Sequence, residues 1–464
     1  MSKEMNSFRQ KDVILKCEPF VHVLTSKERE DRCEQCFQRQ KKLLKCSACK
    51  VVRYCDKSCQ RQCWDIHKLE CKCFQNVAPK VPTESVRVLL RLILKYQKGH
   101  FKSLDSPKLR CFDDFLDHLE DMKKDEERIE QFMDLQITLR AFVNRVVDLP
   151  PLEYIFLLFA RMCINSFSIT DGEMQPMGVG IYLSASILDH SCHPDAVVTF
   201  TGTTLEVRAL RDIPHADISK VRISYIELLA PREERRAALK RYYFRCDCTR
   251  CLDDNLDDLM LCSRCTTKSC EEVILSATET CPACKAIFSD GYRKQKLVAI
   301  NRCKEALKTL KDNEETDQIA QAPSGTESSE VVVVNLAEKC LEHVNTILPP
   351  RNIYVVNIRE KLFDAFINLG QWEKALECGS MTREPQKTPL LPECSHNDGI
   401  HLMKIGKIQL YLQHLEGALQ SLQEAETILD VTLGKSHPKY RELMDLINES
   451  QEEMRVTLEH SDGT

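Results

Sequence analysis

The chain has 464 residues, of which 43% are hydrophobic and 29% are charged, and its formal net charge is −5. This length is too great for one core, so we expect two to four domains of an ordinary globular protein. The near-neutral charge argues against a dedicated DNA-binding protein, and no apolar run approaches the roughly 18 residues of a membrane-spanning helix.

The cysteine content is the most unusual feature of the composition. Residues 1–6 carry no apolar core of a secretory signal, so we expect a protein of the cytoplasm and nucleus, where thiols stay reduced. The chain nevertheless contains 25 cysteines, many of them in CxxC pairs. In a reducing compartment this pattern indicates zinc ligands rather than disulfides.

Two short strand-like segments, 13–15 and 21–24, open the chain and are too small to form a domain, so we expect them to pair with strands elsewhere. Seven of the eight cysteines in the next segment of 39 residues, together with one histidine, have the spacing of metal ligands and suffice for two tetrahedral zinc sites. With so few apolar residues, this segment needs metal for folding, which structural zinc can stabilise by about 10–16 kcal/mol. The eight candidate ligands are Cys33, Cys36, Cys46, Cys49, Cys55, Cys59, His67 and Cys71.

Helical patterns follow the cysteine-rich segment. His67 and Cys71 are four residues apart and share one face of a helix predicted over 64–71. Residues 74–163 are predicted to be helical, with apolar positions over 86–94 and a second helix over about 111–146. A further apolar helix is expected over 152–163, after the prolines at 150 and 151.

The pattern then changes to short strands. We expect strands over 165–169, 177–182, 196–200, 204–210 and 221–225, which predict a compact, largely β region. A polar stretch, Asp189-His190-Ser191-Cys192-His193-Pro194, separates two of the apolar runs. Such a stretch is expected to contact something other than core, although a plain turn with a structural cysteine remains the alternative.

Two further cysteine groups follow a charged helix predicted over 232–245. Cys246, Cys248 and Cys251 offer three thiolates, and Cys192 is the natural fourth ligand of a third zinc. Two CxxC pairs separated by fifteen residues fit a zinc-ribbon pattern and indicate a fourth zinc, with Cys270 left over. The ligands expected for that fourth site are Cys262, Cys265, Cys281 and Cys284; other cysteines, including Cys63, Cys73 and Cys163, are expected to pack in cores.

From about residue 295 the chain is again predicted to be helical. A polar loop is expected over 311–330. Beyond it, the segment 370–376 is echoed by 412–419, with the Ala-Leu pairs 43 residues apart. This loose repeat predicts a tetratricopeptide-like helical array, and an unrelated helical bundle is the alternative.

The spacing of the first eight ligands resembles that of the MYND zinc finger. In that family the pairs interleave, which implies that Cys33 and Cys36 join Cys55 and Cys59, while the other four ligands form the second site. The resemblance implies binding of proline-rich peptides. Residues 31–73 hold eleven Lys or Arg against five Asp or Glu, so weak nucleic-acid binding is the most we expect, and solvated lysines are the alternative explanation.

The finger, the stretch at 189–194, Tyr225, the CxCxxC group and the helical pairs occur in the order of the SET and MYND domain lysine methyltransferases, and the chain most resembles the third vertebrate member. The phrases Asn165-Ser166-Phe167, Ser224-Tyr225 and Asn352-Ile353-Tyr354 carry this resemblance. It implies an α+β fold in which the finger and a helical insert split a mainly β SET domain. The implied segments are a SET remnant 1–32, the finger 33–71, a helical insert 72–163, the core SET domain 164–229, a post-SET zinc region 230–290 and the helical array 291–464.

The resemblance also implies an activity, the transfer of a methyl group from S-adenosylmethionine to a protein lysine, histone or not. Tyr225 would be the catalytic-site tyrosine, and Phe167 and Tyr242 would line the lysine channel. We expect a monomer whose partners are the substrate protein and chaperone or transcription proteins. The cofactor would contact Asn165, Asp189, His190, Tyr225 and Phe244, although Phe167 and Phe244 as core and Tyr225 as a strand-end residue are the alternatives.

The chain departs from the family at positions near the cofactor. No glycine precedes Gly99, whereas the family has an N-terminal glycine turn, and Asp189 stands where the family has asparagine. Arg110 aligns with a position that is often tyrosine. A catalytically impaired adaptor, binding partners through the finger and the helical array, is therefore the alternative function.

Overall fold

The computed structural model describes residues 7–99, 110–276, 278–317, 328–386 and 395–462. The chain forms two compact units, each with its own core. The first unit comprises Met1–His190, Pro194–Ile223 and Leu239–Arg245, and the second comprises Ser191–His193, Ser224–Ala238 and Cys246–Thr464. Within the described residues no helix is long and apolar enough to cross a membrane.

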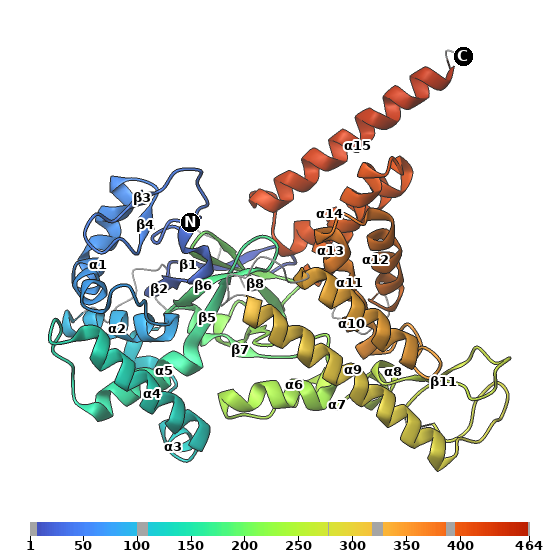
Figure 1. The fold of residues 1–464 in the computed structure, drawn as a ribbon, viewed down its shortest axis with the longest axis horizontal. Helices are drawn as coiled ribbons and strands as arrows, with labels where there is room; N and C mark the ends of the chain where they lie inside the picture. The colour runs from blue at the N-terminus through green and yellow to red at the C-terminus, as the bar shows by residue number, and fades with distance from the viewer. Residues whose placement is uncertain (1–6, 100–109, 277, 318–327, 387–394, 463–464) are drawn as a thin grey trace. The chain divides into compact units, whose positions relative to one another are not determined.

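The first unit contains two three-stranded antiparallel sheets (Figure 1). Each combines one of the two N-terminal strands with strands more than 140 residues later in the chain, which confirms that the short N-terminal segments pair elsewhere. One sheet has the order β1-β9-β8 and the other β2-β6-β5. The strands are β1 (Val13–Cys17), β2 (Val21–Leu24), β5 (Ser166–Thr170), β6 (Pro176–Ile181), β8 (Ala196–Thr201) and β9 (Thr204–Ala209).

The central strand of the second sheet needs its glycines for close packing. A Cβ atom on Gly178 would lie 2.4 Å from a ring carbon of Phe37 and 2.5 Å from the carbonyl oxygen of Val23. Phe37 belongs to the cysteine-rich segment, and Val23 to the neighbouring strand β2. The glycine therefore lets the cysteine-rich segment lie directly against the sheet.

The helices of the first unit pack against this sheet and against one another. Helix α2 covers β2 and β6, and its apolar residues from Val86 to Leu94 are buried, as their spacing predicts; Arg87 and Arg91 between them are buried as well. The cysteine-rich segment adds two short paired strands, β3 (Leu44–Lys45) and β4 (Arg53–Tyr54). The helices are α1 (Lys57–Val77), α2 (Glu84–Gln97), α3 (Leu119–Met122), α4 (Glu126–Val143) and α5 (Leu152–Asn165).

The prediction of one helix over 111–146 is wrong. Phe112 lies in a 3₁₀ turn, η2 (Phe112–Asp114), and the chain is then extended at Phe115, with both rings buried in the core. Helix α4 starts only after Asp125, whose carboxylate accepts a hydrogen bond from the backbone N–H of Arg128. The apolar spacing at 112–122 thus reflects burial of a 3₁₀ turn, an extended stretch and the short helix α3, and not one face of a single helix.

The remaining strands of the first unit carry the polar stretch. Strand β7 (Asp189–His190) runs parallel to β10 (Arg222–Ile223), so that His190 lies opposite Ile223. The predicted strand over 221–225 is therefore shorter than expected.

The helix predicted over 232–245 is also shorter, because α6 (Arg232–Leu239) is followed by a 3₁₀ turn and by Tyr243 with φ of 60°.

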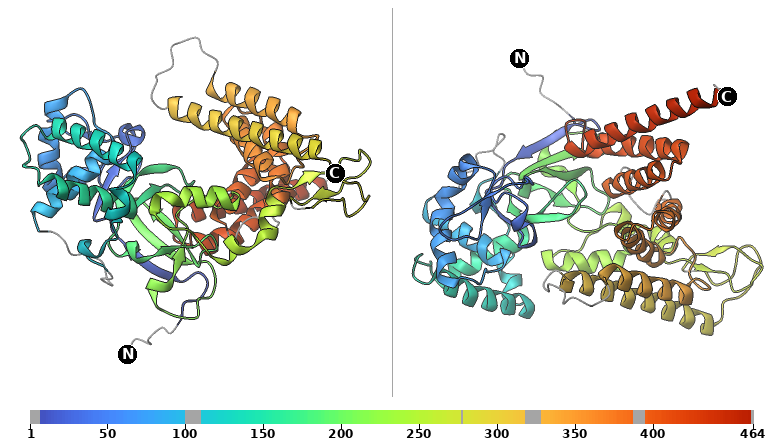
Figure 2. Two further views of the ribbon diagram at one scale, coloured as in Figure 1. Left: turned by 90° about the horizontal axis from the view of Figure 1, so that it is seen from below. Right: turned by 45° about the horizontal axis from the view of Figure 1, so that its top comes forward.

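The second unit is mainly helical. The short elements α7 (Thr249–Leu252) and α8 (Asp254–Met260) precede a two-stranded ribbon, β11 (Ser263–Arg264) and β12 (Val273–Ile274). Helices then pack in sequential pairs, including α9 with α10, which lie side by side in Figure 2. They are α9 (Asp290–Asp317), α10 (Ser329–Val344), α11 (Ile353–Asn368), α12 (Trp372–Gln386), α13 (His396–Tyr411), α14 (Leu415–Thr432) and α15 (Pro438–Asp462).

The loop predicted over 311–330 is in part helical, because α9 extends to Asp317 and α10 begins at Ser329; residues 318–327 lie outside the described residues. The prediction of a loop at 311–317 rested on polarity alone and is wrong, since the exposed end of a helix can also be polar. Farther along, Gly406 permits close packing of α13 on α14: a Cβ there would lie 2.6 Å from the Cγ of Leu422. The C-terminal region is thus a bundle of closely packed helix pairs.

Candidate metal centres and functional site

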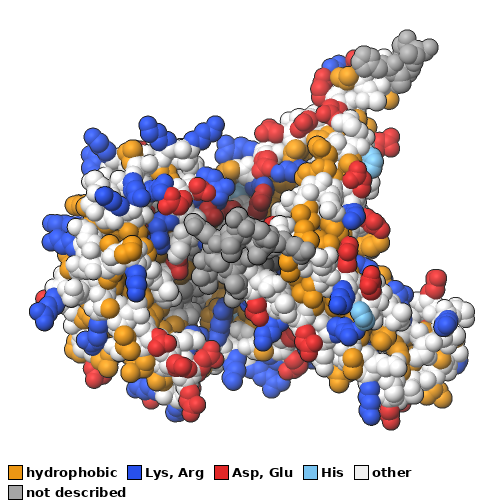
Figure 3. All heavy atoms as spheres, viewed as in Figure 1, with side chains coloured by type: hydrophobic (Ala, Val, Ile, Leu, Met, Phe, Trp, Pro, Cys, Tyr) orange, Lys and Arg blue, Asp and Glu red, His pale blue; other side chains and the backbone are white. Residues whose placement is uncertain are grey.

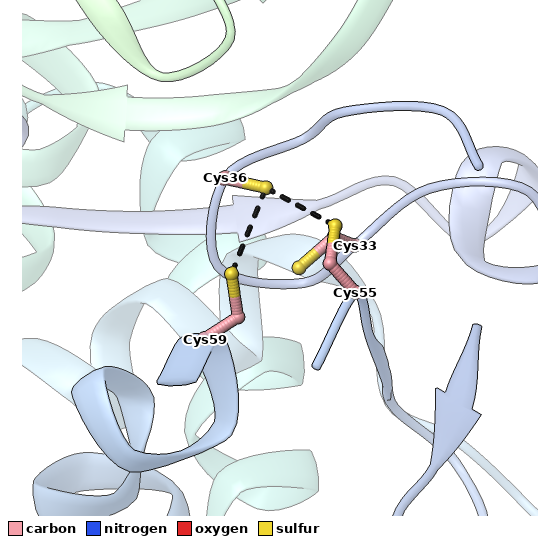
Figure 4. Close-up of side chains that lie close together, drawn as sticks. All are labelled: Cys33, Cys36, Cys55 and Cys59. Carbon is pink, nitrogen blue, oxygen red and sulfur yellow. Dashed lines mark hydrogen bonds between the residues drawn. The ribbon is translucent and has the colours of Figure 1, made fainter. Parts of the chain in front are cut away.

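The first group of candidate ligands lies in the cysteine-rich segment of the first unit. Cys33 and Cys36 come from the loop after β2, Cys55 follows β4, and Cys59 lies in the first turn of α1 (Figure 4). The sulfur of Cys36 is 3.6 Å from that of Cys55 and 3.9 Å from that of Cys59. Since Zn–S bonds of about 2.3 Å in a tetrahedron separate the sulfurs by roughly 3.8 Å, the group fits zinc.

The second group interleaves with the first. The sulfur of Cys46 lies 3.9 Å from that of Cys71, and the sulfur of Cys49 lies 3.8 Å from Nε2 of His67. His67 and Cys71 face the site from one side of α1, and all four residues are buried. The structure thus brings together both sets of four that the resemblance to MYND fingers implies.

A buried carboxylate backs the histidine. Nδ1 of His67 is 3.6 Å from Oε2 of Glu70, while Nε2 faces the metal group. A carboxylate behind a metal-bound imidazole fixes the ring and its tautomer, and it raises the basicity of the ligand. Glu70 therefore suits the role of orienting His67 toward zinc.

Glu70 belongs to a fully buried network of two carboxylates and two guanidinium groups that sequence inspection did not reveal. Nη2 of Arg91 donates to both Glu34 and Glu70 at 2.7 Å, and Arg87 donates to the same two carboxylates at 2.7 and 2.9 Å. Arg87 and Arg91 lie on α2, inside its otherwise apolar buried run. That position, arginine within a wholly buried helix face, was the signal in the sequence.

The network is balanced in charge and ties the cysteine-rich segment to α2. Burial disfavours the ionised form of Glu34, but the charges of Arg87 and Arg91 outweigh it and hold the pKa of that carboxyl below its usual value. The pKa of Glu70 is lowered for the same reasons. Both carboxylates are thus ionised inside the protein, and each depends on its arginine partners.

The third group lies in the second unit. The sulfur of Cys192 is 3.5 Å from that of Cys251, and Cys246 and Cys248 complete the set, as the sequence predicts. Two arginines surround it: Nη2 of Arg235 donates to the sulfur of Cys251 at 3.8 Å, and Arg250 donates to the carbonyl oxygen of Cys192 at 3.3 Å. These cations suit four thiolates, whose charge a single Zn²⁺ neutralises only in part.

The prediction for the fourth group is wrong at one position. Cys265, Cys281 and Cys284 gather with Cys270, not with Cys262. The two residues between Cys262 and Cys265 form strand β11, in which alternate side chains point to opposite faces. The turn that lets a CxxC pair share a metal is therefore absent there, and Cys262 is fully buried elsewhere.

Four residues expected near the cofactor lie in the first unit. The amide Nδ2 of Asn165 donates to the carbonyl oxygens of Leu116 and Arg161, both at 2.8 Å. The ring of His190 is buried, with its centroid 5.9 Å from that of Phe244, whose side chain remains 37% exposed. The carboxylate of Asp189 is 59% exposed and lies 3.6 Å from Nη2 of Arg222.

The three residues expected at the lysine are half-buried. In the first unit, the ring of Phe167 packs edge-on against Tyr182 at 5.7 Å, and the guanidinium of Arg241 lies over the ring of Tyr242 at 5.0 Å. Tyr225 belongs to the second unit, two residues beyond the end of β10. Arg110, noted as a departure from the family, donates to the carbonyl oxygen of Ser186 at 2.7 Å.

The two interleaved groups of four candidate zinc ligands define a MYND-finger protein, and residues 33–71 match the family model of the MYND finger. The chain is 30% identical to the histone-lysine N-methyltransferase SMYD3 of Homo sapiens over 98% of this chain and 96% of that protein. It is 28% identical to the N-lysine methyltransferase SMYD2 of Homo sapiens, over 95% and 94% of the two chains. The chain belongs to the SET and MYND domain lysine methyltransferase family.

Proposed function

We propose that this protein transfers a methyl group from S-adenosylmethionine to the side-chain amine of a lysine in a protein substrate, in the cytoplasm and nucleus. The observation that carries the proposal is similarity to named lysine methyltransferases over nearly the whole of both chains. Support comes from the Cys192 group, because its ligands come from segments more than fifty residues apart and converge as the family resemblance implies.

The proposed architecture is a SET domain interrupted by the finger and the helical insert. In this proposal β1 and β2 belong with β5 to β10, and pairing of β2 with β6 supports it. The C-terminal helix pairs would form the tetratricopeptide-like array. The segment boundaries stated from the resemblance are part of the same proposal.

The chemistry requires little covalent help from the protein. The sulfonium of the cofactor supplies an already activated methyl group, so the protein must hold the lysine amine in line with the S–CH₃ bond. The amine must be neutral, and an apolar channel lowers its pKa by desolvation. Phe167 and Tyr242 would form that channel, where aromatic faces also accept a methylammonium product through cation–π contact.

Two of the residues assigned to the cofactor suit its chemical groups, an ammonium group and a planar ring. Because both N–H bonds of Asn165 are used by backbone carbonyls, the oxygen Oδ1 is what this side chain offers to a ligand, and an oxygen acceptor suits an ammonium group. A half-exposed Phe244 beside the buried His190 offers an apolar face to a planar ring such as adenine.

Replacing Asp189 with asparagine, the residue typical of the family, should change the affinity for S-adenosylmethionine less than fivefold. The carboxylate is mostly exposed and paired with Arg222, and exposed ion pairs contribute at most about 1 kcal/mol. Calorimetric titration of Asp189→Asn beside the wild type measures the change. A gain of tenfold or more would show that the carboxylate faces the cofactor and damages the site.

The transfer itself can be tested without knowing the substrate. The zinc-loaded protein is incubated with S-adenosylmethionine labelled in its methyl group and with an arrayed library of lysine-containing peptides. We expect label on a subset of peptides, lost when the target lysine is replaced by arginine. Cofactor binding without label on any peptide or on proteins of a cell extract would contradict transfer to lysine.

The adaptor function remains the second proposal, because residues 1–98 contain no glycine and Asp189 stands where the family has asparagine. Its proposed partners are proline-rich peptides at the finger. The finger surface is basic, since nine of the eleven Lys and Arg in residues 31–73 are exposed while Glu34 and Glu70 are buried (Figure 3). An adaptor would bind peptides at this surface without binding S-adenosylmethionine.

A further inference from the structure

The segment between α8 and α9 has almost no core of its own. Among the described residues from Ser263 to Ser289, which leave out 277, the buried cluster consists of four residues, and two of these are cysteines. Only two backbone pairs join strands β11 and β12. So few apolar contacts cannot offset the entropy of ordering this many residues, so another source of stability is required.

Four thiols converge in this segment. The sulfur of Cys265 is 3.4 Å from that of Cys284, and the sulfur of Cys270 is 3.7 Å from that of Cys281. All four sulfur atoms lie within 4.8 Å of one another. These separations are near the roughly 3.8 Å edge of a tetrahedron with Zn–S bonds of about 2.3 Å.

The backbone around Cys281 and Cys284 repeats the geometry of the finger. The N–H of Lys285 donates to the carbonyl oxygen of Cys281 at 3.0 Å, and Lys285 has φ of 60°. In the finger, Phe37 and Lys50 occupy the same place after a CxxC pair, with φ of 59° and 57° and hydrogen bonds of 2.9 and 3.0 Å to the first cysteine. Three CxxC turns of this chain thus share one conformation, and two of them belong to the segment that matches the MYND finger model.

The other pair of thiols is presented by a hairpin loop. The N–H of Cys265 donates to the carbonyl oxygen of Glu272 at 3.2 Å, and that of Thr267 donates to the sulfur of Cys265 at 3.5 Å. The N–H of Cys284 donates to the sulfur of Cys281 at the same distance. Backbone N–H bonds to sulfur favour the thiolate, the form that binds metal.

We propose that Cys265, Cys270, Cys281 and Cys284 bind a structural zinc ion that folds this segment and is additional to the three ions expected at the other groups. A closed set of four thiolates is typical of structural zinc and leaves no position open for catalysis. This site does not depend on the proposed methyl transfer, because it involves none of the residues assigned to the cofactor or the lysine.

The base of the segment is held independently of the ion. Nδ2 of Asn352 donates to the carbonyl oxygen of Cys262 at 2.8 Å, and the N–H of Arg264 donates to the carbonyl oxygen of Ile347, also at 2.8 Å. The hydroxyl of Tyr292 donates to the carbonyl oxygen of Arg264. Loss of the ion is therefore expected to disorder residues 265–285 while the helical bundle stays folded.

The test compares two matched variants, Cys270→Ala and Cys262→Ala, by counting metal per chain with plasma mass spectrometry. We expect four zinc ions in the wild type and in Cys262→Ala, and three in Cys270→Ala. The exposed ligand gives a second variant, Cys284→Ala, which should lose the same ion with little risk to the fold. Trypsin should cut the two ligand variants within 265–285 and leave the wild type intact there.

Other outcomes would overturn the proposal. Three zinc ions in the wild type and in Cys270→Ala would show that the thiols hold no ion. Loss of one ion from Cys262→Ala and not from Cys270→Ala would show that Cys262, and not Cys270, is the fourth ligand. Iron in place of the fourth zinc, which the same thiolate geometry also accepts, would refute the choice of metal.

Discussion

Replacing Tyr225 with phenylalanine should lower the rate of methyl transfer about 100-fold or more while leaving the fold intact. The substitution removes one hydroxyl from a half-buried side chain and keeps the ring. Loss of one preorganised polar group that acts on the reacting atoms costs on the order of 10²–10³ in rate. The effect should fall on turnover more than on affinity for the cofactor, because the ring of Tyr225, which is expected to contact the cofactor, is retained.

The measurement is a comparison of transfer rate and cofactor affinity on the peptide that the library identifies. Tyr411→Phe is the matched control, since Tyr411 lies in the C-terminal bundle, 66% exposed, and should retain the wild-type rate. If Tyr225→Phe transfers methyl groups as fast as this control does, Tyr225 is not the catalytic-site tyrosine and the assignment by resemblance is incorrect.

Replacing Arg91 with methionine should destabilise the first unit by about 3–5 kcal/mol, the cost of breaking a buried ion pair on one side. Arg91 donates to both Glu34 and Glu70, and its side chain also reaches the carbonyl oxygen of His22 on β2. Without it, Arg87 alone must balance two buried carboxylates. The finger should also bind zinc less tightly, because Glu70 orients His67.

Denaturant unfolding of the zinc-loaded protein measures the loss of stability, and transfer of zinc to a chromogenic chelator measures the affinity of the finger. Arg455→Met is the control, because Arg455 pairs with Glu452 on an exposed helix face, both 61% exposed. This change should leave the stability almost unchanged, because an exposed ion pair is screened by water. If both substitutions change the free energy of unfolding by the same small amount, the buried network makes no net contribution to stability.

Much of the fold follows from local patterns. Zinc ligands in the finger were predictable because a metal site requires particular side chains at short spacings, and these are visible in one sequence. The apolar positions over 86–94 likewise predicted a buried helix, and α2 buries every residue there. In contrast, the pairing of β2 with β6 follows from no local pattern. Pairing of the N-terminal strands with later strands was expected because they are too short alone and because the family resemblance implies a split domain.

The errors arise where the same residues fit two local structures. Phe112 and Phe115 are spaced as on a helix, yet both are buried from an irregular segment. Cys262 and Cys265 read as a CxxC pair, but the intervening strand β11 separates their side chains. Cys270 was passed over because its five-residue spacing from Cys265 matches no short zinc motif.

The charged network shows what single-sequence analysis overlooks. Glu34, Glu70, Arg87 and Arg91 come from three segments, and only the two arginines, which interrupt the apolar run of α2, stand out in the sequence. Their burial is a property of the assembled finger and helix α2. Asp189 is the opposite case, a residue that was expected at the cofactor but whose carboxylate is exposed. The pairing of β7 with β10 places it beside Arg222.

The most direct test of the central claim is calorimetric titration of the folded, zinc-loaded protein with S-adenosylmethionine. The proposed methyltransferase should bind one molecule per chain, and the demethylated product, S-adenosylhomocysteine, should compete for the same site. His190→Ala should abolish the binding, because His190 is assigned to the cofactor. No heat from a folded sample with its full zinc content would contradict the account and leave the adaptor function.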